Sequence, residues 1–348
     1  MKIKSIVIAA SLISLINTHL LAAEENQWPT GVTVTGLVQI EARYNQDYDK
    51  VDASDFVVDE LGVGIEAQVH KWATAQIVFL YEEGVTPLEI DEAIITLGNL
   101  EASPVYLSTG QLYVPFGNFE SNMISDSLTL ELAETREKAL QIGFEAGGAY
   151  GSIYGFNGST QDDANDTIEH YGAQIGFALE SGPASFDLGI GYISDISDSD
   201  GLTDALGGED NVPYLVDYDY VDGLAAHLIV NAAGVNLIGE YVMALDTFKV
   251  DHLAFNGNGA EPKAWNVELG YTFKLANQEM TFALGYQGTE EALALGLPET
   301  RYLGSLSVGI FQNTALSLEY AFDEDYAQSE GGTGEDGNQV ILQLAVEF

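Results

Sequence analysis

Four histidines remain once a predicted signal peptide is removed, namely His70, His170, His227 and His252. They occupy separate segments, and none is followed by a second His four residues later. Catalysis needs a nucleophile or a carboxyl group placed beside a base. Barrel lipases and proteases use Ser/His or Asp/His arrangements at the outer rim, where His170 and His252 are expected, but no such motif occurs here. We therefore expect the protein not to be an enzyme.

Acidic residues gather in segments that are predicted to be loops. Asp198, Asp200 and Gly201 match the third, fifth and sixth positions of the calcium-binding EF-hand loop. Ile196 and Gly207 stand where that loop needs its first carboxylate and its bidentate Glu, so the motif fails. We expect no cofactor beyond loosely bound calcium at the outer loops. A solvated surface that faces lipopolysaccharide is an alternative explanation for the same acidic residues. The acidic segments are 47–55, 162–166, 194–222 and 323–336.

One long predicted connection, 114–138, carries charges of both signs. Its portion 123–133 alternates like a strand, but a seventeenth strand would put every later long loop on the wrong side of the membrane. Pro115 cannot donate to a strand ladder and would start the connection. The segment either folds into the lumen as a constriction, as in general porins, or forms a surface flap or short hairpin. The candidate constriction residues are Tyr113, Pro115, Glu120, Asp126, Glu131, Glu134, Arg136 and Lys138.

Strands of a membrane barrel are the elements expected to position these side chains. Apolar and polar residues alternate in segments of roughly ten residues, the length that a tilted strand needs to cross a bilayer. This pattern predicts an all-β fold, a transmembrane antiparallel β-barrel of about 16 strands. The predicted strands are 32–44, 57–70, 72–82, 90–98, 105–113, 139–147, 149–158, 169–180, 185–194, 219–231, 234–246, 263–275, 279–289, 302–311, 314–323 and 338–348.

Short and long connections alternate along the chain, as in bacterial barrels with periplasmic turns and outer loops. An even number of strands places both termini in the periplasm. The last strand alternates up to Phe348, a pattern that the barrel assembly machinery recognises. The short connections are 70–72, 147–149, 181–184, 232–233, 276–278 and 312–313.

The first residues predict export. Lys2 and Lys4 precede an apolar run that ends in Ala22 and Ala23, as in a secretory signal peptide. We expect 1–23 to be the signal and 24–348 the barrel, in the outer membrane of a Gram-negative cell. Because only Glu24 to about Thr30 precede the first strand, we expect no plug domain and therefore passive transport.

The charge balance narrows the class of partner. Loss of Lys2 and Lys4 leaves 9 of the 11 basic residues against 54 acidic ones. Nucleic acid is excluded as a partner, since phosphate binding needs clustered Lys and Arg. The acid favours cations or cation-complexed ligands over anions. Membrane lipid and lipopolysaccharide are expected neighbours, and a homotrimer is compatible with sixteen strands.

Two segments resemble the LbtU-type siderophore porins. They are 110–117, which reads GQLYVPFG, and 124–145, which reads ISDSLTLELAETREKALQIGFE, and the likeness extends from TGLVQIEARY at Thr35 to Phe348. The resemblance implies a plug-free barrel that takes up iron as a ferric siderophore or passes other small solutes. It brings no defined ligand residues, and we expect Tyr113 and Arg136 to be the first residues worth testing. A general cation-preferring diffusion porin and a non-transporting structural or adhesive barrel remain alternatives.

Overall fold

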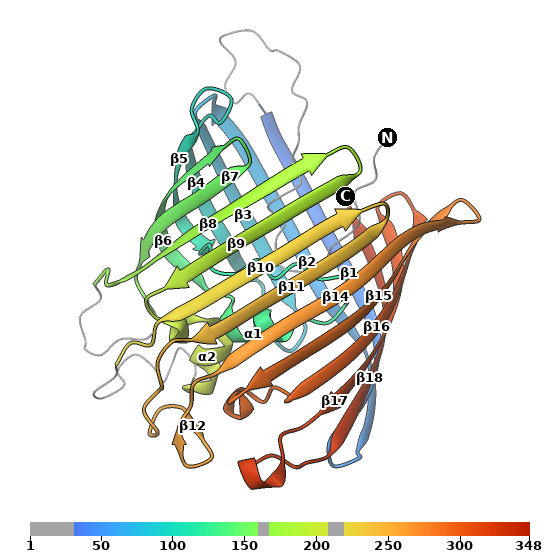
Figure 1. Ribbon diagram of the computed structural model, residues 1–348. Coiled ribbons are helices and arrows are strands. Elements are labelled where there is room, and N and C mark those ends of the chain that lie inside the picture. The colour runs from blue at the N-terminus through green and yellow to red at the C-terminus, as the bar shows by residue number, and fades with distance from the viewer. Residues whose placement is uncertain (1–30, 159–166, 208–218) are drawn as a thin grey trace.

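The computed structural model describes residues 31–158, 167–207 and 219–348, which form one closed barrel (Figure 1). Sixteen antiparallel strands run around it in the order β1–β11 and β14–β18, and β18 closes on β1. The expected all-β, porin-like barrel of sixteen strands is thereby confirmed. The predicted signal peptide, 1–23, lies outside the described residues, as do the acidic segment 162–166 and positions 208–218 of another acidic segment.

Each segment predicted as a strand overlaps one strand of the barrel. The barrel strands are β1 (Gly31–Gln46), β2 (Asp52–His70), β3 (Ala73–Glu82), β4 (Glu89–Gly98), β5 (Val105–Tyr113), β6 (Arg136–Ala146), β7 (Ala149–Phe156), β8 (His170–Ser181), β9 (Ala184–Ile193), β10 (Gly223–Ala232), β11 (Val235–Ala244), β14 (Lys263–Leu275), β15 (Gln278–Glu290), β16 (Thr300–Phe311), β17 (Thr314–Glu324) and β18 (Asp336–Glu347). A small hairpin of β12 (Ala254–Phe255) and β13 (Asn258–Gly259), which the sequence did not predict, lies between β11 and β14.

Short helices occur only in connections of the described chain. They are α1 (Leu128–Ala133), α2 (Asp200–Ala205), η1 (Ile196–Asp198), η2 (Leu293–Leu295) and η3 (Gln328–Glu330). None of these helices is long and apolar enough to cross a membrane.

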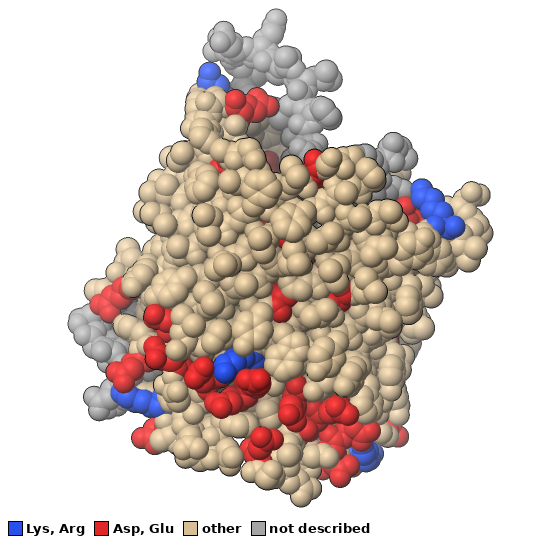
Figure 2. All heavy atoms as spheres, viewed as in Figure 1, with Lys and Arg blue, Asp and Glu red and all other residues tan. Residues whose placement is uncertain are grey.

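The two faces of each strand meet different surroundings. In β14, Val267 and Leu269 are exposed on the outside of the barrel, whereas Asn266 and Glu268, which alternate with them, are fully buried inside it. Figure 2 shows the result on the face in view as a broad tan belt, with acidic side chains gathered at the end that carries the long connections. An apolar belt bounded by charge is the outer surface of a transmembrane barrel.

Tight turns close the other end of the barrel. At Ala233–Gly234 and Ala276–Asn277 both residues have positive φ, the backbone that two-residue hairpin turns require. The turn at 147–148 is built from Gly147 and Gly148, which also have positive φ. These turns lie where the sequence predicts short connections, so short turns and long loops alternate along the chain as expected.

The barrel closes through its first and last strands. Gly36 and Phe348 exchange two backbone hydrogen bonds of 2.8 and 3.0 Å, which extend the β1–β18 ladder to the last residue. The ring of Phe348 lies against Gly36, where an added Cβ would come within 2.2 Å of it. Glycine at position 36 therefore makes room for the terminal aromatic ring.

Part of the interior is filled by an apolar core. Leu128 and Leu132 of α1 pack with Phe116, Phe156 of β7 and Leu202 of α2, all of them fully buried. The same cluster includes Ile193, Ala225, Val242 and Ala264, from β9, β10, β11 and β14. This core, called here the interior core, occupies the outer end of the barrel on the side of β6–β11 and β14.

Candidate functional site

The connection after β5 enters the lumen rather than covering the rim. The chain turns at Pro115, where the N–H of Phe116 donates to the carbonyl oxygen of Val114 at 2.7 Å, and Gly117 follows with positive φ. Residues 114–135, called here the crossing segment, then run to the far wall and return to β6. Strand β6 begins at Arg136, three residues before the predicted start, so Arg136 and Lys138 belong to the wall.

Glu240 of β11 holds the first part of the crossing segment. Its carboxylate accepts the backbone N–H of Asn118 at 2.7 Å and that of Phe119 at 3.2 Å. It also accepts the hydroxyl of Thr129 at 2.9 Å, so it joins the outgoing and the returning chain. Glu240 is buried. Buried carboxylates that accept several N–H groups make strong, charge-assisted hydrogen bonds.

Glu268 of β14 holds the next part. It accepts the backbone N–H of Asn122 and the hydroxyl of Ser121, both at 2.6 Å. Asn266, its neighbour on the same strand, donates to it at 2.9 Å and fixes its orientation. The amide of Asn122 also reaches Asn236 of β11 at 2.6 Å. The side-chain amide of Asn122 donates to Glu268 as well, so four polar groups donate to this one fully buried carboxylate.

Glu319 of β17 holds the tip. It accepts the backbone N–H groups of Ile124 and Ser125 and the hydroxyl of Ser125. Ser305 of β16 adds a bond from its hydroxyl to the carbonyl oxygen of Asn122 at 3.1 Å. The crossing segment is thus tied to the wall opposite its point of entry.

Glu240, Glu268 and Glu319 were not among the predicted site residues. They are three inward-facing carboxylates on strands that are otherwise apolar outside, and an inward Glu in a strand was the sequence signal that could have found them. We call them the three anchor carboxylates. Their partners lie 122, 146 and 195 residues away along the chain, which local pattern does not reveal.

Helix α1 returns the crossing segment to β6. Ser127 caps its N-terminus by accepting the N–H of Leu130 at 3.2 Å, and Gln287 of β15 accepts the N–H of Leu128 at 3.2 Å. Leu128 and Leu132 bury one face of the helix in the interior core. The opposite face carries Glu131, which is exposed.

Asp126 and Glu131 are exposed to solvent although barrel strands surround them. Enclosure within the barrel, together with the charges of Glu131 and Glu82, raises the pKa of the Asp126 carboxyl to about 7. Burial, followed by the charges of Asp126 and Asp200, raises the pKa of Glu134 well above its ordinary value. Three of the predicted carboxylates thus lie together and repel one another.

The wall that faces these carboxylates is acidic as well. A bulge in β2 leaves Asp59 without a register partner, since Gln39 pairs with Glu60 and Ile40 pairs with Val58. The Asp59 carboxylate accepts from the Arg43 guanidinium. Bulges redirect side chains in this way. Asp59 and Glu82 both contribute charge to the surroundings of Asp126.

The nearby guanidinium groups already have acidic partners. Arg43 binds Glu41 as well as Asp59. Arg301 of β16 makes a bidentate pair with Asp323 of β17, with N–O distances of 2.8 and 2.9 Å. Arg301 also contributes positive charge near Asp126 and Glu131. Net negative charge therefore remains around Asp126.

Tyr113 and Arg136 lie opposite each other where the crossing segment leaves β5 and enters β6. Both contact Asp91, at 2.9 Å from the Tyr113 hydroxyl and 2.8 Å from the Arg136 guanidinium, and Arg136 also binds Glu89 at 2.7 Å. Asp91 occupies a second bulge, since Val78 pairs with Glu92 and Phe79 with Ile90. The two residues singled out from the sequence thus fasten both ends of the crossing segment to β4.

Two of the predicted constriction residues lie apart from Asp126. Glu120 is half-buried on the crossing segment, where burial and the charge of Asp187 raise its pKa. Lys138 is exposed in β6, in register with Gln111 and on the same face as the exposed Leu140. Lys138 therefore lies on the outer face of the barrel. Pro115 remains at the turn described above.

Several carboxylates of this arrangement could attract a cation. Carboxylates from the crossing segment (Asp126, Glu131) and from the wall (Asp59, Glu82) surround one region, which we call the acidic region. Carboxylate-lined constrictions attract cations and repel anions. Tyr150, Asp187 and His227 form a separate hydrogen-bonded group on β7, β9 and β10, in which the Tyr150 hydroxyl donates to Asp187 at 2.8 Å.

Proteins similar in sequence have names that give a family and state no activity. A UPF0422 protein of Legionella pneumophila (strain Lens) is 28% identical over 360 residues, covering 91% of this chain and 66% of that protein. A UPF0422 protein of Coxiella burnetii is 32% identical over 250 residues, covering 70% of this chain and 53% of that protein. The chain therefore spans just under two thirds of the length of the Legionella relative. No protein-family model matches the chain.

Solved structures share the fold at low sequence identity. The outer membrane channel DcaP of Acinetobacter baumannii has a TM-score of 0.62 at 16% identity and covers 91% of this chain and 97% of its own. The anion-selective porin from Comamonas acidovorans has a TM-score of 0.62 at 14% identity, covering 91% and 99%. Salmonella typhi OmpF, solved with daunomycin, has a TM-score of 0.62 at 12% identity, covering 91% and 97%. The chain thus has the fold of outer-membrane porins, while its resemblance to LbtU-type siderophore porins stays a prediction.

Proposed function

We propose that this protein is a passive outer-membrane channel that prefers cations or cation-complexed solutes. The observation that carries the proposal is the acidic region, in which Asp126 and Glu131 of the crossing segment meet Asp59 and Glu82 of the wall. The neighbouring Arg43 is already bound to carboxylates. A narrowed passage with net negative charge concentrates cations and excludes anions.

The crossing segment gives the proposed passage a fixed wall. The three anchor carboxylates accept backbone N–H groups along its outgoing half, and one face of α1 is buried in the interior core. Passage is therefore proposed on the side of β1–β4, where Asp126 and Glu131 are exposed and Asp59 and Glu82 are partly exposed. A selective channel needs such a preorganised lining, because mobile charges lose their geometry.

Reversal potentials in planar bilayers test this proposal directly. The purified full chain is expected to conduct, and a potassium chloride gradient should give a reversal potential of the sign for cation preference. A channel that prefers anions would contradict the proposal. Absence of any conductance from a folded barrel would favour the alternative of a structural or adhesive barrel.

Uptake of a ferric siderophore is a second proposed function. It is supported by the resemblance of 110–117 and 124–145 to LbtU-type siderophore porins, since these residues form the end of β5, most of the crossing segment and β6. The acidic region would suit a neutral or cationic complex better than an anionic one. A deletion strain should grow poorly under iron limitation with added siderophore and should take up less labelled ferric siderophore. Normal uptake in that strain would leave only the general cation channel.

The same proposal implies the protein's surroundings. The apolar belt would contact membrane lipid, and the acidic loops would face lipopolysaccharide. The barrel assembly machinery would recognise strand β18. The homotrimer that is compatible with sixteen strands remains a prediction. Cross-linking of the protein in native outer membranes would test the trimer.

A further inference from the structure

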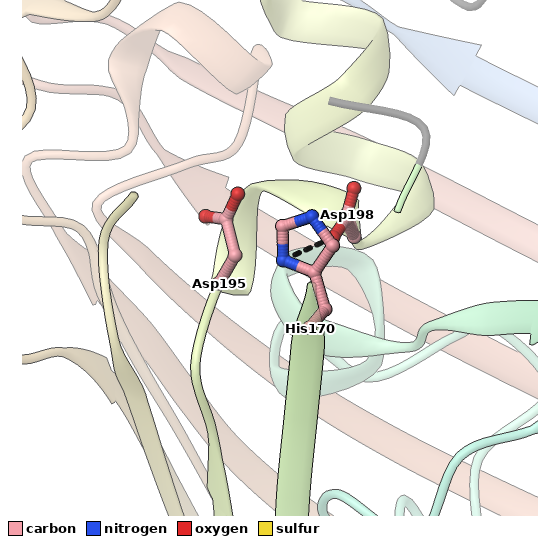
Figure 3. A group of neighbouring side chains, drawn as sticks. All are labelled: His170, Asp195 and Asp198. Atoms are coloured by element: carbon pink, nitrogen blue, oxygen red, sulfur yellow. Dashed lines mark ion pairs between the residues drawn. The ribbon is translucent and has the colours of Figure 1, made fainter. Parts of the chain in front are cut away.

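A buried group of three side chains lies outside the acidic region. His170 begins β8, while Asp195 and Asp198 belong to the connection that follows β9. Figure 3 shows the imidazole of His170 between the two carboxylates. Possible ligand atoms of the three residues all lie within 4.8 Å of one another, and the three residues are 3%, 0% and 3% exposed. The His170 Nδ1 and an oxygen of Asp198 are 3.6 Å apart.

These residue types and distances fit one small metal ion. Ligand atoms on a shared zinc ion are at most about 4.2 Å apart, so only small side-chain movements separate this group from a bound geometry. An imidazole nitrogen with two carboxylates suits zinc and other divalent transition ions. Calcium prefers oxygen ligands alone. The group therefore differs from the loose calcium site expected from the outer loops.

The charge of the group also favours a cation. Buried carboxylates need positive charge close by, and a protonated His170 could balance only one of the two. The whole stretch 139–248, which contains the three residues, has no Lys or Arg in its sequence. A compensating side-chain cation would have to come from outside that stretch. A divalent ion would balance both carboxylates at once.

The surroundings hold the three side chains in place. The N–H groups of Ser197 and Val221 donate to Asp195 Oδ1 at 3.2 and 3.3 Å. The centre of the His170 ring lies 5.4 Å from that of the Phe156 ring, with the two planes tilted, and 4.8 Å from that of Tyr220 in an edge-on contact. Ligands that are oriented by neighbours in this way bind metal more tightly than freely rotating ones.

Close backbone approach completes the pocket. An added Cβ at Gly158 would come within 2.4 Å of Asp198 and 2.5 Å of His170. Any larger side chain at position 158 would therefore displace Asp198 or His170, the two possible ligands.

The group is joined to the crossing segment. Ser199, which directly follows Asp198, donates its hydroxyl to the carbonyl oxygen of Leu132 at 2.7 Å, and the N–H of Asp200 donates to Glu134 at 3.0 Å. Gly201 packs so closely that an added Cβ would be 2.0 Å from the carbonyl oxygen of Glu131. Whatever fixes Asp198 therefore also fixes the end of α1.

The geometry points to a structural site for a divalent transition ion, formed by His170, Asp195 and Asp198. The ion ties β8 to the connection after β9 and, through Ser199 and Asp200, steadies the crossing segment. This site does not depend on what passes through the barrel, so it can be tested separately from transport.

Titration of the folded full-length barrel with Zn²⁺ tests the site. The protein is first stripped with a chelator in detergent, and binding is followed by calorimetry with Mn²⁺ and Ca²⁺ as comparison ions. One Zn²⁺ per chain is expected to bind and to raise the thermal unfolding temperature. His170→Ala and Asp198→Asn should each weaken binding at least about tenfold, since even residues that only orient ligands have effects of that size. The zinc-dependent rise in unfolding temperature should disappear as well.

Two variants serve as matched controls. His70→Ala removes an exposed histidine from a tight turn, and Asp204→Asn removes an exposed carboxylate from the same connection as Asp198. Both should bind Zn²⁺ as the unchanged protein does. Heat-modifiable migration on gels reports whether each variant is folded, and the isosteric Asp198→Asn keeps the test valid if His170→Ala misfolds. No stoichiometric binding, binding that survives both ligand changes, or stoichiometric binding of Ca²⁺ alone would overturn the site.

Discussion

The charge of the acidic region resides in individual side chains that can be removed one at a time. Asp126 and Glu131 are exposed on the crossing segment, so Asp126→Asn and Glu131→Gln change charge with little loss of packing. One charge about 8 Å from a passing ion contributes roughly 0.5 kcal/mol in water, or about a twofold change in local cation concentration. Each substitution should lower the cation-to-anion permeability ratio about twofold. Reversal potentials measure the change, and an unchanged ratio in the double variant would place the selectivity elsewhere.

The raised pKa of Asp126 makes a second prediction about the same residue. With its pKa at about 7, Asp126 is charged above neutral pH and becomes protonated as the pH falls through 7. Cation selectivity should therefore drop between pH 8 and pH 6, well above the range of an ordinary Asp, which titrates near pH 4. Reversal potentials recorded across this range give the titration curve. The drop in cation selectivity near pH 7 should be absent from the Asp126→Asn variant. If the variant still shows this drop, another group causes it.

At the scale of elements, the crossing segment depends on the wall that it reaches. Glu319 accepts the N–H groups of Ile124 and Ser125, and a hydrogen bond to a charged group contributes about 1.5–3 kcal/mol. Glu319→Ala should therefore release the tip of the segment without unfolding the barrel. Single-channel conductance should rise and become noisier, and amide hydrogens of 118–126 should exchange faster.

A charge-matched control separates anchoring from electrostatics. Glu66 of β2 is half-buried and shares the inward face with Gly62 and Gly64 of its strand. Glu66→Ala removes the same charge from the barrel wall but no bond to the crossing segment. If Glu66→Ala raised conductance and exchange as much as Glu319→Ala, the anchoring role of Glu319 would be refuted.

The sequence predicted the elements better than the contacts between them. Alternation identifies strands because each residue of a barrel strand faces either lipid or interior, and every strand of the barrel was located in this way. Helix α1 was missed since the alternation within 123–133 mimics a strand, and its helical form depends on the cap at Ser127 and on burial of Leu128 and Leu132. The bulges that present Asp59 and Asp91 leave no local signature. They are visible only as a slip in pairing with the neighbouring strand.

At the scale of the whole molecule, the barrel divides its interior between two tasks. On the side of β6–β11 and β14, apolar side chains from the wall and the connections close the outer end. On the side of β1–β4, Asp126 and Glu131 are exposed to solvent, and Asp59 and Glu82 of the wall are partly exposed. The crossing segment is the partition, with Leu132 facing the core and Glu131 facing the carboxylates. One short stretch of chain can therefore shape a passage only because a complete barrel supports both of its faces.

If the apolar belt lies in the bilayer, the cost of a charged substitution on the outer face should depend on its depth in the membrane. Leu269 lies at the middle of β14 and Leu275 at its tight-turn end, and both are exposed on the outer face. Arginine on a lipid-facing position costs about 2–4 kcal/mol at the bilayer midplane and about 0–1 kcal/mol near the interface. Leu269→Arg should therefore lower the free energy of unfolding in lipid vesicles by about 2–4 kcal/mol, and Leu275→Arg by less than about 1 kcal/mol. Denaturant titration of the refolded barrel measures both. Because the two variants introduce the same side chain on the same face of the same strand, equal costs would mean that the apolar belt does not mark the position of the bilayer.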